Sequence, residues 1–545
     1  MKTNVSLCIA AALMVAACGD PSHRHNSGEK VSVINSEPDE VIEEDVEIIS
    51  DEAALMEPSA NATSKMILSS PPQQRNAETY KEIKENSFVA VAQQPVTTFS
   101  ADIDRAAYAN VRRIIGYGQI PPKDAVRIEE MVNYFDYDYP APEEGSVSPL
   151  RVSPELAPAP WNPNHLLLRI GLQAKKIDLA KAPPSNIVFL IDVSGSMDED
   201  NKLPLLKSSF KMLLGQLRPD DKIAIVTYAN GTKVALPSTS VKDKEKIIKV
   251  LDNLYASGGT SGGKGIQLAY EQAQKSFIKN GNNRIILATD GDFNIGINNT
   301  TDLEKFIEKQ RESGIYMSVL GFGIGNYRDD MAETIADKGN GNYAYIDNIT
   351  EAKKVLVNEL SGTLFAVAKD VKLQLEFNPK YVKEYKLIGY ENRMLANEDF
   401  TNDKKDAGEI GAGHTVTALY ELVPSDGKVA QSLRYQSQEL NEKGKGNELG
   451  FLKIRYKDPK VKDAKSVEIT EPLVFNKKAL KETSTDYRFA ASVAEFGILL
   501  RDNSNKANAT YGQVIELAEG AIGKDPEGYR KEFVRLVKSV KMLPK

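Results

Sequence analysis

The sequence predicts an α/β protein built around a doubly wound, mostly parallel sheet. Between residues 184 and 363, short apolar segments alternate with amphipathic helical segments. This alternation is typical of parallel strands that are covered by helices on both faces. We expect the strands at residues 187–191, 223–228, 285–288, 317–321 and 343–346. In such a sheet, ligands bind beyond the carboxyl ends of the strands.

The region before this sheet, residues 81–183, predicts an N-terminal α+β region. We expect strands at residues 95–100 and 166–172, and helices at residues 106–117 and from Asp124 to about residue 134. The stretch 134–139 is rich in tyrosine, and we expect it to pack in the core between modules.

The region after the sheet, residues 364–545, predicts an antiparallel, β-sandwich-like module followed by terminal helices. Apolar and polar residues alternate at residues 371–377, and further strands are expected at 452–456 and 467–470. The helices are expected at residues 487–500, 511–521 and 528–542. The strands near Leu166 and Val371 flank the α/β domain. We therefore expect them to pair, which would make that domain (184–363) an insertion in a sandwich-like platform.

The first residues predict a signal peptide, residues 1–17. Lys2 precedes an apolar run at residues 7–17 that is too short to span a membrane. The run ends in Val15-Ala16-Ala17-Cys18, which resembles the lipobox of bacterial lipoproteins. This resemblance implies cleavage before Cys18 and acylation of its thiol, and each buried CH₂ of an acyl chain contributes about 0.8 kcal/mol to membrane binding. An ordinary signal peptide with an incidental cysteine is the alternative.

Residues 18–80 predict a disordered, acidic tether. Residues 37–57 hold ten Asp or Glu and no Lys or Arg, and the net charge of the chain is −7. This balance argues against binding of nucleic acid. The two cysteines, Cys8 and Cys18, both lie near the start, which excludes a disulfide framework in the folded part. We expect a lipid-anchored protein of the bacterial cell envelope, with its folded part in the periplasm or at the cell surface.

Three oxygen-rich segments follow predicted strands or precede a predicted helix. Asp192-Val193-Ser194-Gly195-Ser196 ends the first core strand, Thr260 lies in a glycine-rich loop, and Thr289-Asp290-Gly291 ends the central strand. In a doubly wound sheet these loops would converge on one edge. Hydroxyl and carboxylate oxygens suit Mg²⁺, which prefers about six oxygen ligands and retains water. Since hydroxyls carry no charge, the ion would stay Lewis-acidic toward an incoming carboxylate.

This arrangement resembles the metal-ion-dependent adhesion site of von Willebrand factor A domains. The resemblance implies the metal ligands Asp192, Ser194, Ser196, Thr260 and Asp290. It also implies a bound Mg²⁺ (or Mn²⁺ or Ca²⁺) whose coordination shell is completed by an Asp or Glu of a protein partner. A von Willebrand fold that has lost its metal is the alternative. Nearby acids are expected to form a solvated rim: Asp198, Glu199, Asp200 and Asp292.

The flanking regions resemble the YfbK-like family of bacterial lipoproteins. The segments that carry this resemblance are residues 85–89, 98–104, 126–135, 390–393, 406–414 and 416–421. The triplet Arg105-Ala106-Ala107 departs from the Thr-Ala-Ser type that this family usually has. The resemblance covers most of the chain after the tether and specifies its architecture rather than its biological role.

The other motifs do not indicate a second binding or catalytic site. Residues 258–265 come near a P-loop, but Gly265 stands where Ser or Thr must bind Mg²⁺, so no nucleotide is expected. Ser194 and Ser196 lack both a G-x-S-x-G context and a histidine partner. Asp102 and Asp104 would either bind a second cation or cap the helix at residue 106, and we favour the cap. His414 lies near Asp403, Asp406 and Glu409, where a polar hairpin is favoured over a metal cluster.

These features together predict a membrane-anchored, metal-dependent protein-binding module for adhesion or envelope assembly, and not an enzyme. A structural envelope assembly factor, in which the metal only holds three loops together, is the alternative. A metal-dependent hydrolase is a third hypothesis, and we favour it least because the sequence offers no positioned base.

Overall fold

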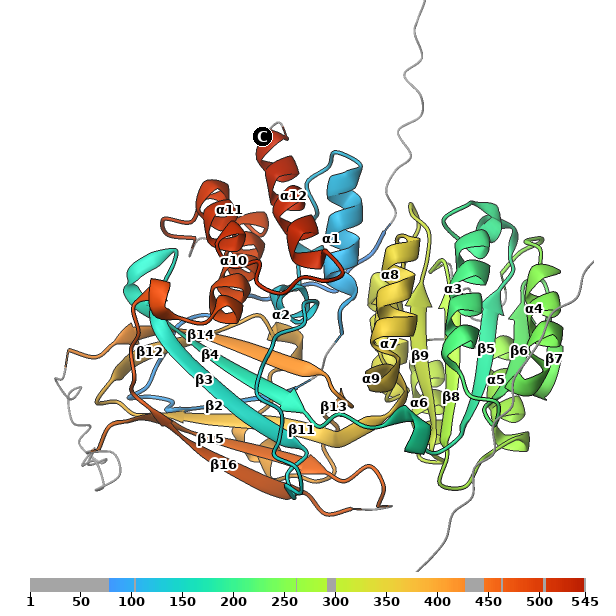
Figure 1. Cartoon of the computed structure of the whole chain (residues 1–545), viewed down its shortest axis with the longest axis horizontal. Helices are drawn as coiled ribbons and strands as arrows, with labels where there is room; N and C mark the ends of the chain where they lie inside the picture. The colour runs from blue at the N-terminus through green and yellow to red at the C-terminus, as the bar shows by residue number, and fades with distance from the viewer. Residues whose placement is uncertain are drawn as a thin grey trace, which may run out of the picture. The chain divides into compact units, whose positions relative to one another are not determined.

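The structure, a computed structural model, describes most of the chain after residue 77 (Figure 1). The described residues are 78–101, 104–260, 262–291, 300–426, 446–461, 464–502 and 506–543. The predicted signal peptide, Cys18 and all but the last residues of the predicted tether lie outside them. Within these residues, no helix combines the length and the apolar character that crossing a membrane requires.

A six-stranded sheet forms the middle of the α/β domain, in the order β10-β9-β8-β5-β6-β7. The predicted parallel strands are present as β5 (Ser185–Asp192), β6 (Lys222–Tyr228), β8 (Asn282–Thr289), β9 (Ile315–Gly321) and β10 (Tyr343–Tyr345). The edge strand β7 (Thr232–Ser240) is antiparallel to β6 and was not predicted. Its Pro237 suits an edge, because proline cannot donate a ladder hydrogen bond.

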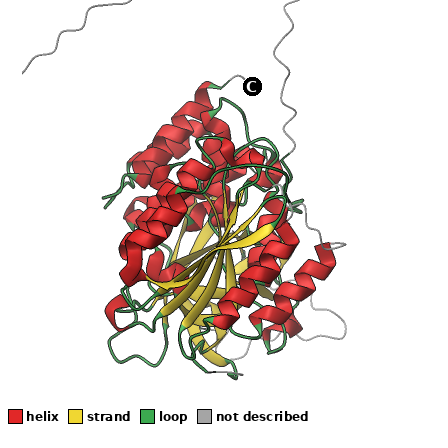
Figure 2. Ribbon diagram, turned by 90° about the vertical axis from the view of Figure 1, so that its right-hand side faces the viewer, coloured by secondary structure: helices red, strands yellow, loops and turns green. Residues whose placement is uncertain are grey.

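Two apolar cores lie on opposite faces of this sheet. Ile187, Phe189 and Ile191 of β5 belong to one core, while Val188 and Leu190 belong to the other. The first face is covered by α3 (Leu203–Gln216), α4 (Lys244–Asp252), α8 (Ile349–Lys353), a π-helical turn (Lys354–Asn358) and α9 (Leu360–Leu364). The second is covered by α5 (Gly262–Lys275), α6 (Thr300–Arg311) and α7 (Asp329–Lys338). Helices on both sides of the strands are visible in Figure 2, and the predicted doubly wound α/β fold is confirmed.

A β-sandwich lies beside the α/β domain and consists of two sheets with one shared apolar core (Figure 1). The first sheet is β1 (Val89–Ala90), β12 (Val382–Ile388), β14 (Thr415–Pro424), β4 (Asn162–Ala174) and β3 (Leu150–Ala159). The second is β13 (Gly408–Gly411), β11 (Ala366–Phe377), β15 (Glu448–Lys457) and β16 (Val467–Val474), with β2 (Val96–Ser100) also paired to β11.

Each sheet combines strands from before and after the α/β domain. β4 pairs with β14, and β2 pairs with β11, both antiparallel. The α/β domain is therefore inserted between strands that complete the same sandwich. The prediction that the strands near Leu166 and Val371 pair directly is wrong, because Leu166 lies opposite Leu422 of β14. The two segments instead face each other across the core, since an alternating pattern determines the buried face of a strand but not its partner.

Helices from both ends of the chain form a cap on the sandwich. They are α1 (Ala106–Gly116), α2 (Ile128–Asn133), α10 (Thr485–Leu500), α11 (Tyr511–Glu519) and α12 (Tyr529–Met542), which share one apolar core. The tyrosine-rich stretch packs in this core, as predicted. Phe135, for example, contacts the rings of Phe489 and Phe533 edge-on at centroid distances of 4.9 and 5.7 Å.

Buried ion pairs join the cap and the sandwich to the α/β domain. Arg127 lies 2.6 Å from Asp329 of α7, and Arg393 lies 2.8 Å from Asp104. Asp104 also accepts a hydrogen bond from the backbone N–H of Tyr343 in β10, at 2.8 Å. The prediction that Asp104 caps a helix is wrong: the cap position of α1 is Arg105, which makes no side-chain capping bond. Asp102 lies outside the described residues.

Glu495 of α10 provides a test of the packing of the cap. Its carboxyl is fully buried among apolar residues, and this burial raises its pKa to about 8. The folded protein therefore keeps Glu495 protonated at pH values where the unfolded chain has already released that proton. The free energy of unfolding should thus fall as pH rises from about 5 to about 8.

We expect Glu495→Gln to remove this pH dependence and to raise Tm at pH 8 by about 2–4 °C. Thermal melting at several pH values checks this expectation. Glu516→Gln, the same change at an exposed position of α11, serves as the control and should leave Tm unchanged. Parallel pH profiles for wild type and Glu495→Gln would contradict the assignment.

Candidate metal centre

The predicted metal site lies at the carboxyl edge of the central sheet. Asp192 is the last residue of β5, and Asp290 directly follows the last residue of β8. The loop that carries Thr260 is joined to the turn after β5 by two backbone hydrogen bonds. Gly195 N–H donates to Gly258 O and Ser257 N–H donates to Val193 O, each at 2.8 Å. The fold thus holds the turn after β5 and the Thr260 loop against each other.

Three of the predicted ligands share one turn. Ser194 N–H donates to Asp192 Oδ1 at 2.8 Å, and the hydroxyl oxygens of Ser194 and Ser196 are 3.1 Å apart. Asp192 and Ser194 are buried, whereas Ser196 and Thr260 are half-buried. The site is therefore closed on the side of the sheet, and Ser196 and Thr260 lie nearer to solvent.

Asn230 holds the Thr260 loop in place and was not identified from the sequence. Its Oδ1 accepts a hydrogen bond from Gly259 N–H at 2.6 Å. Gly258 has a φ of +78°, and a Cβ atom there would lie 2.4 Å from Asn230 Nδ2. A glycine is needed for both reasons. The Asn230-Gly231 dipeptide marks the turn between β6 and β7, and this hairpin signal could have pointed to the residue.

The charge of the site favours a cation. Asp192 and Asp290 are both at most 1% exposed, so water does not solvate either carboxyl. Burial, and to a smaller extent the neighbouring Asp290 carboxylate, raises the pKa of Asp192 to about 7. Two buried carboxylates with adjacent hydroxyls fit a hard divalent cation, whose charge would stabilise their ionised forms.

Lys202, at the start of α3, also reaches this edge and was not identified from the sequence. Its Nζ donates to Ser196 O at 2.9 Å and lies 3.4 Å from Asp290 Oδ2. The acids predicted to form a rim, Asp198, Glu199 and Asp200, are exposed, as expected. Asp292 lies outside the described residues.

The residues around His414 do not form a second metal site. His414 is buried against Gly362, and burial lowers its pKa to about 4. Asp406 pairs with Arg311 at 2.6 Å, and Asp403 pairs with Arg455 at 3.1 Å. Across the described part of the chain, no group of three or more His, Cys, Asp or Glu side chains is placed to hold a metal ion.

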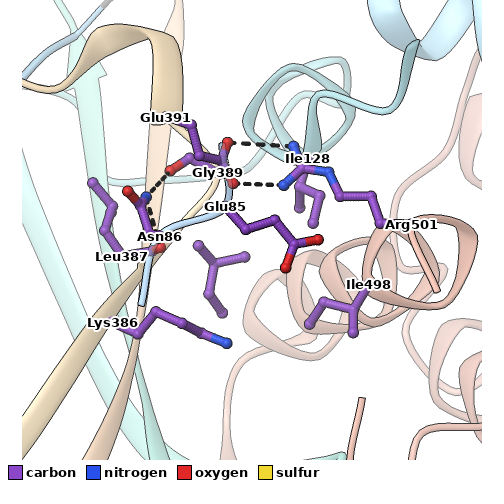
Figure 3. A pocket seen from close by; sticks show the side chains of 10 residues that line it. Glu85, Asn86, Ile128, Lys386, Leu387, Gly389, Glu391, Ile498 and Arg501 are labelled. Atoms are coloured by element: carbon purple, nitrogen blue, oxygen red, sulfur yellow. Dashed lines mark hydrogen bonds and ion pairs between the residues drawn. The ribbon is translucent and has the colours of Figure 1, made fainter. Parts of the chain in front are cut away.

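A pocket between the sandwich and the cap is also lined by polar groups (Figure 3). Asn86 Nδ2 donates to Gly389 O at 2.9 Å, and Arg501 Nη1 lies 2.5 Å from Glu391 Oε1. These polar groups therefore bind one another and hold the end of α10 against the segment that follows β12. They serve the packing of the cap on the sandwich.

Removal of the Asn230 side chain should loosen the Thr260 loop without disturbing the sheet. We expect Asn230→Ala to weaken Mn²⁺ binding by about three- to tenfold, because one hydrogen bond contributes about 0.5–1.5 kcal/mol. Calorimetric titration with Mn²⁺ measures the change. Asn253→Ala, at an exposed position after α4, is the matched control. Equal affinities in Asn230→Ala and wild type would show that the loop does not depend on this bond.

Three family models match successive parts of the chain. The von Willebrand factor model matches residues 74–169, the von Willebrand factor type A domain model matches residues 186–358, and the model for the C-terminal part of the uncharacterized protein YfbK matches residues 362–543. The α/β domain described above coincides with the second of these matches.

Two similar proteins come from bacteria. The uncharacterized protein YfbK of Escherichia coli (strain K12) is 48% identical over 465 residues, which cover 84% of this chain and 80% of that protein. The uncharacterized protein sll0103 of Synechocystis is 26% identical over 326 residues, which cover 60% of this chain and 74% of that protein. A solved structure, a von Willebrand factor type A protein from Catenulispora acidiphila, is 16% identical with a TM-score of 0.40, covering 71% of this chain and 89% of its own.

The similarity to the Escherichia coli protein extends through the N-terminal region, the α/β domain and the C-terminal module, in agreement with the resemblance noted in the sequence. The chain therefore belongs to the YfbK family, with a von Willebrand factor type A domain inserted in its sandwich.

Proposed function

We propose that this protein is a membrane-anchored, non-enzymatic binding module that grips an acidic residue of a protein partner through a divalent metal ion. The observation that carries this proposal is the pair of buried carboxylates, Asp192 and Asp290, beside the hydroxyls of Ser194 and Ser196. Together with Thr260 they offer oxygen ligands at the edge where α/β sheets bind their ligands.

The chemistry of these ligands favours binding over turnover. A bound Mg²⁺ would supply a Lewis-acidic centre, and ligands that are mostly neutral hydroxyls would leave much of its charge available to a partner's carboxylate. Hydrolysis would also need a base placed near that centre. The two histidines in the described residues lie elsewhere: His165 pairs with Glu421 in the sandwich, and His414 packs on Gly362.

Loss of a carboxylate ligand should weaken metal binding strongly. We expect Asp290→Ala to weaken Mn²⁺ or Mg²⁺ binding at least tenfold by calorimetry, and Thr260→Ala to weaken it less, because Thr260 contributes no charge. Affinity capture from membranes should then recover the same partner with wild type in Mg²⁺, but not with EDTA or with either variant. Ser208→Ala, which removes an exposed hydroxyl of α3 that donates to Pro204 O, is the control.

Two outcomes would change the assignment. If the variants lose the metal and still capture the same partner, the metal only holds the loops together and the protein is a structural assembly factor. If wild type takes up no divalent ion, the proposed binding mechanism is wrong.

The membrane anchor is tested separately. We expect Cys18→Ser to move the protein from the membrane fraction to the soluble fraction, because the variant would lack the thiol that carries the lipid. Immunoblots of both fractions measure this change, and Cys8→Ser is the matched control. A Cys18→Ser variant that stays in the membrane fraction would exclude lipid anchoring at this residue.

A further inference from the structure

Lys202 places a second positive charge beside the candidate metal centre. Only 3% of the residue is exposed. Its Nζ contacts Ser196 O at 2.9 Å, Glu199 Oε1 at 3.2 Å and Asp290 Oδ2 at 3.4 Å. One ammonium group thus touches the turn that carries the serines and the carboxylate at the end of β8.

The fold positions this side chain closely. Gly323, in the loop after β9, has a φ of +81°, and a Cβ atom there would lie 2.3 Å from Lys202 Cε. The backbone of that loop therefore packs directly on the aliphatic stem of the lysine. Lys202 N–H also donates to Glu199 O at 2.9 Å, which fixes the start of α3. Burial of an ammonium group is costly unless it is paired, so these contacts give Lys202 one defined place.

The formal charges at this edge suggest what the lysine does. Asp192 and Asp290 carry two negative charges when ionised, and Lys202 balances one of them. A divalent ion would then leave the loaded site with one net positive charge, which a partner's carboxylate would neutralise. Without Lys202, the loaded site would already be neutral. Glu199 matters less here, because its side chain is 58% exposed and its charge is screened by water.

We propose that Lys202 sets the balance between metal binding and carboxylate binding: it weakens the hold on the metal ion and strengthens the attraction of the loaded site for an acidic partner. This inference rests on the proposed function, since it concerns the same site. In this role Lys202 is a positioning and specificity-determining residue and touches the metal ligand Asp290 rather than the partner.

The experiment compares the purified wild-type chain with Lys202→Met, which keeps an aliphatic stem and removes the charge. Calorimetry with Mn²⁺ alone should show binding about tenfold tighter in the variant, because a buried like charge nearby has been removed. Acetate titrated into the Mn²⁺-loaded protein, followed by water-proton relaxation, should bind several-fold more weakly in the variant. Lys207→Met removes the same charge from the same helix, where Lys207 contacts Asp252 O, and should change neither value.

Further variants guard against a failure to fold. Lys202→Gln is a second neutral variant, for which we expect the same changes as for Lys202→Met. Lys202→Arg keeps the charge and should bind Mn²⁺ and acetate with the affinities of wild type. Circular dichroism identifies the variants that fold.

The Mn²⁺ and acetate affinities together test the role of Lys202 and the proposed function separately. Equal Mn²⁺ and acetate affinities in wild type and the neutral variants overturn the role of Lys202 and leave the proposed function standing. Mn²⁺ binding by Lys202→Met but not by wild type supports the role of Lys202 and contradicts the proposed function. Absence of Mn²⁺ binding in every variant overturns both.

Discussion

The candidate metal centre depends on one constraint, the burial of two carboxylates at one end of a mostly parallel sheet. Asp192 and Asp290 end or follow strands whose other residues are wholly buried, so neither side chain can move into water without distorting the sheet. Their charges must be balanced locally. Lys202 supplies part of that balance from α3, and the turn of Ser194 supplies a backbone N–H. Two ionised carboxylates and one ammonium group leave one formal negative charge among these three side chains, which suits a divalent cation.

The insertion of the α/β domain in the sandwich holds in place the sheet that carries the candidate metal centre. β4 leads into the domain and β11 leads out of it, and each pairs with strands from the opposite side of the insertion. The sandwich core is therefore complete only when both flanking segments are in place. Buried pairs such as Arg127–Asp329 then connect the domain to the cap. Because unpairing a buried charge is costly, these contacts favour one orientation of the domain on its platform.

The chain also returns to the α/β domain where its described part begins. Thr79 forms a bridge with Arg328, and Glu78 pairs with Arg113 of α1 at 2.8 Å. Arg328 belongs to the loop after β9 that also contains Gly323, against which Lys202 packs. The first described residues thus contact the same loop that shapes the surroundings of Lys202. The candidate metal centre, the cap and the N-terminal segment are therefore linked through the loop after β9 and the Glu78–Arg113 pair.

The sequence by itself determined the elements whose signal is local. Strand and helix periodicity gave β5, β8 and the terminal helices, and the D-x-S-x-S spacing with Thr260 and Asp290 gave the candidate ligands, because side chains after parallel strands share one edge. Only the tertiary structure decided which strands pair across the insertion, that Asp104 binds Tyr343 and Arg393 instead of capping α1, and that Asn230 and Lys202 support the site. These features depend on contacts between residues far apart in the chain, for which periodicity and spacing carry no information.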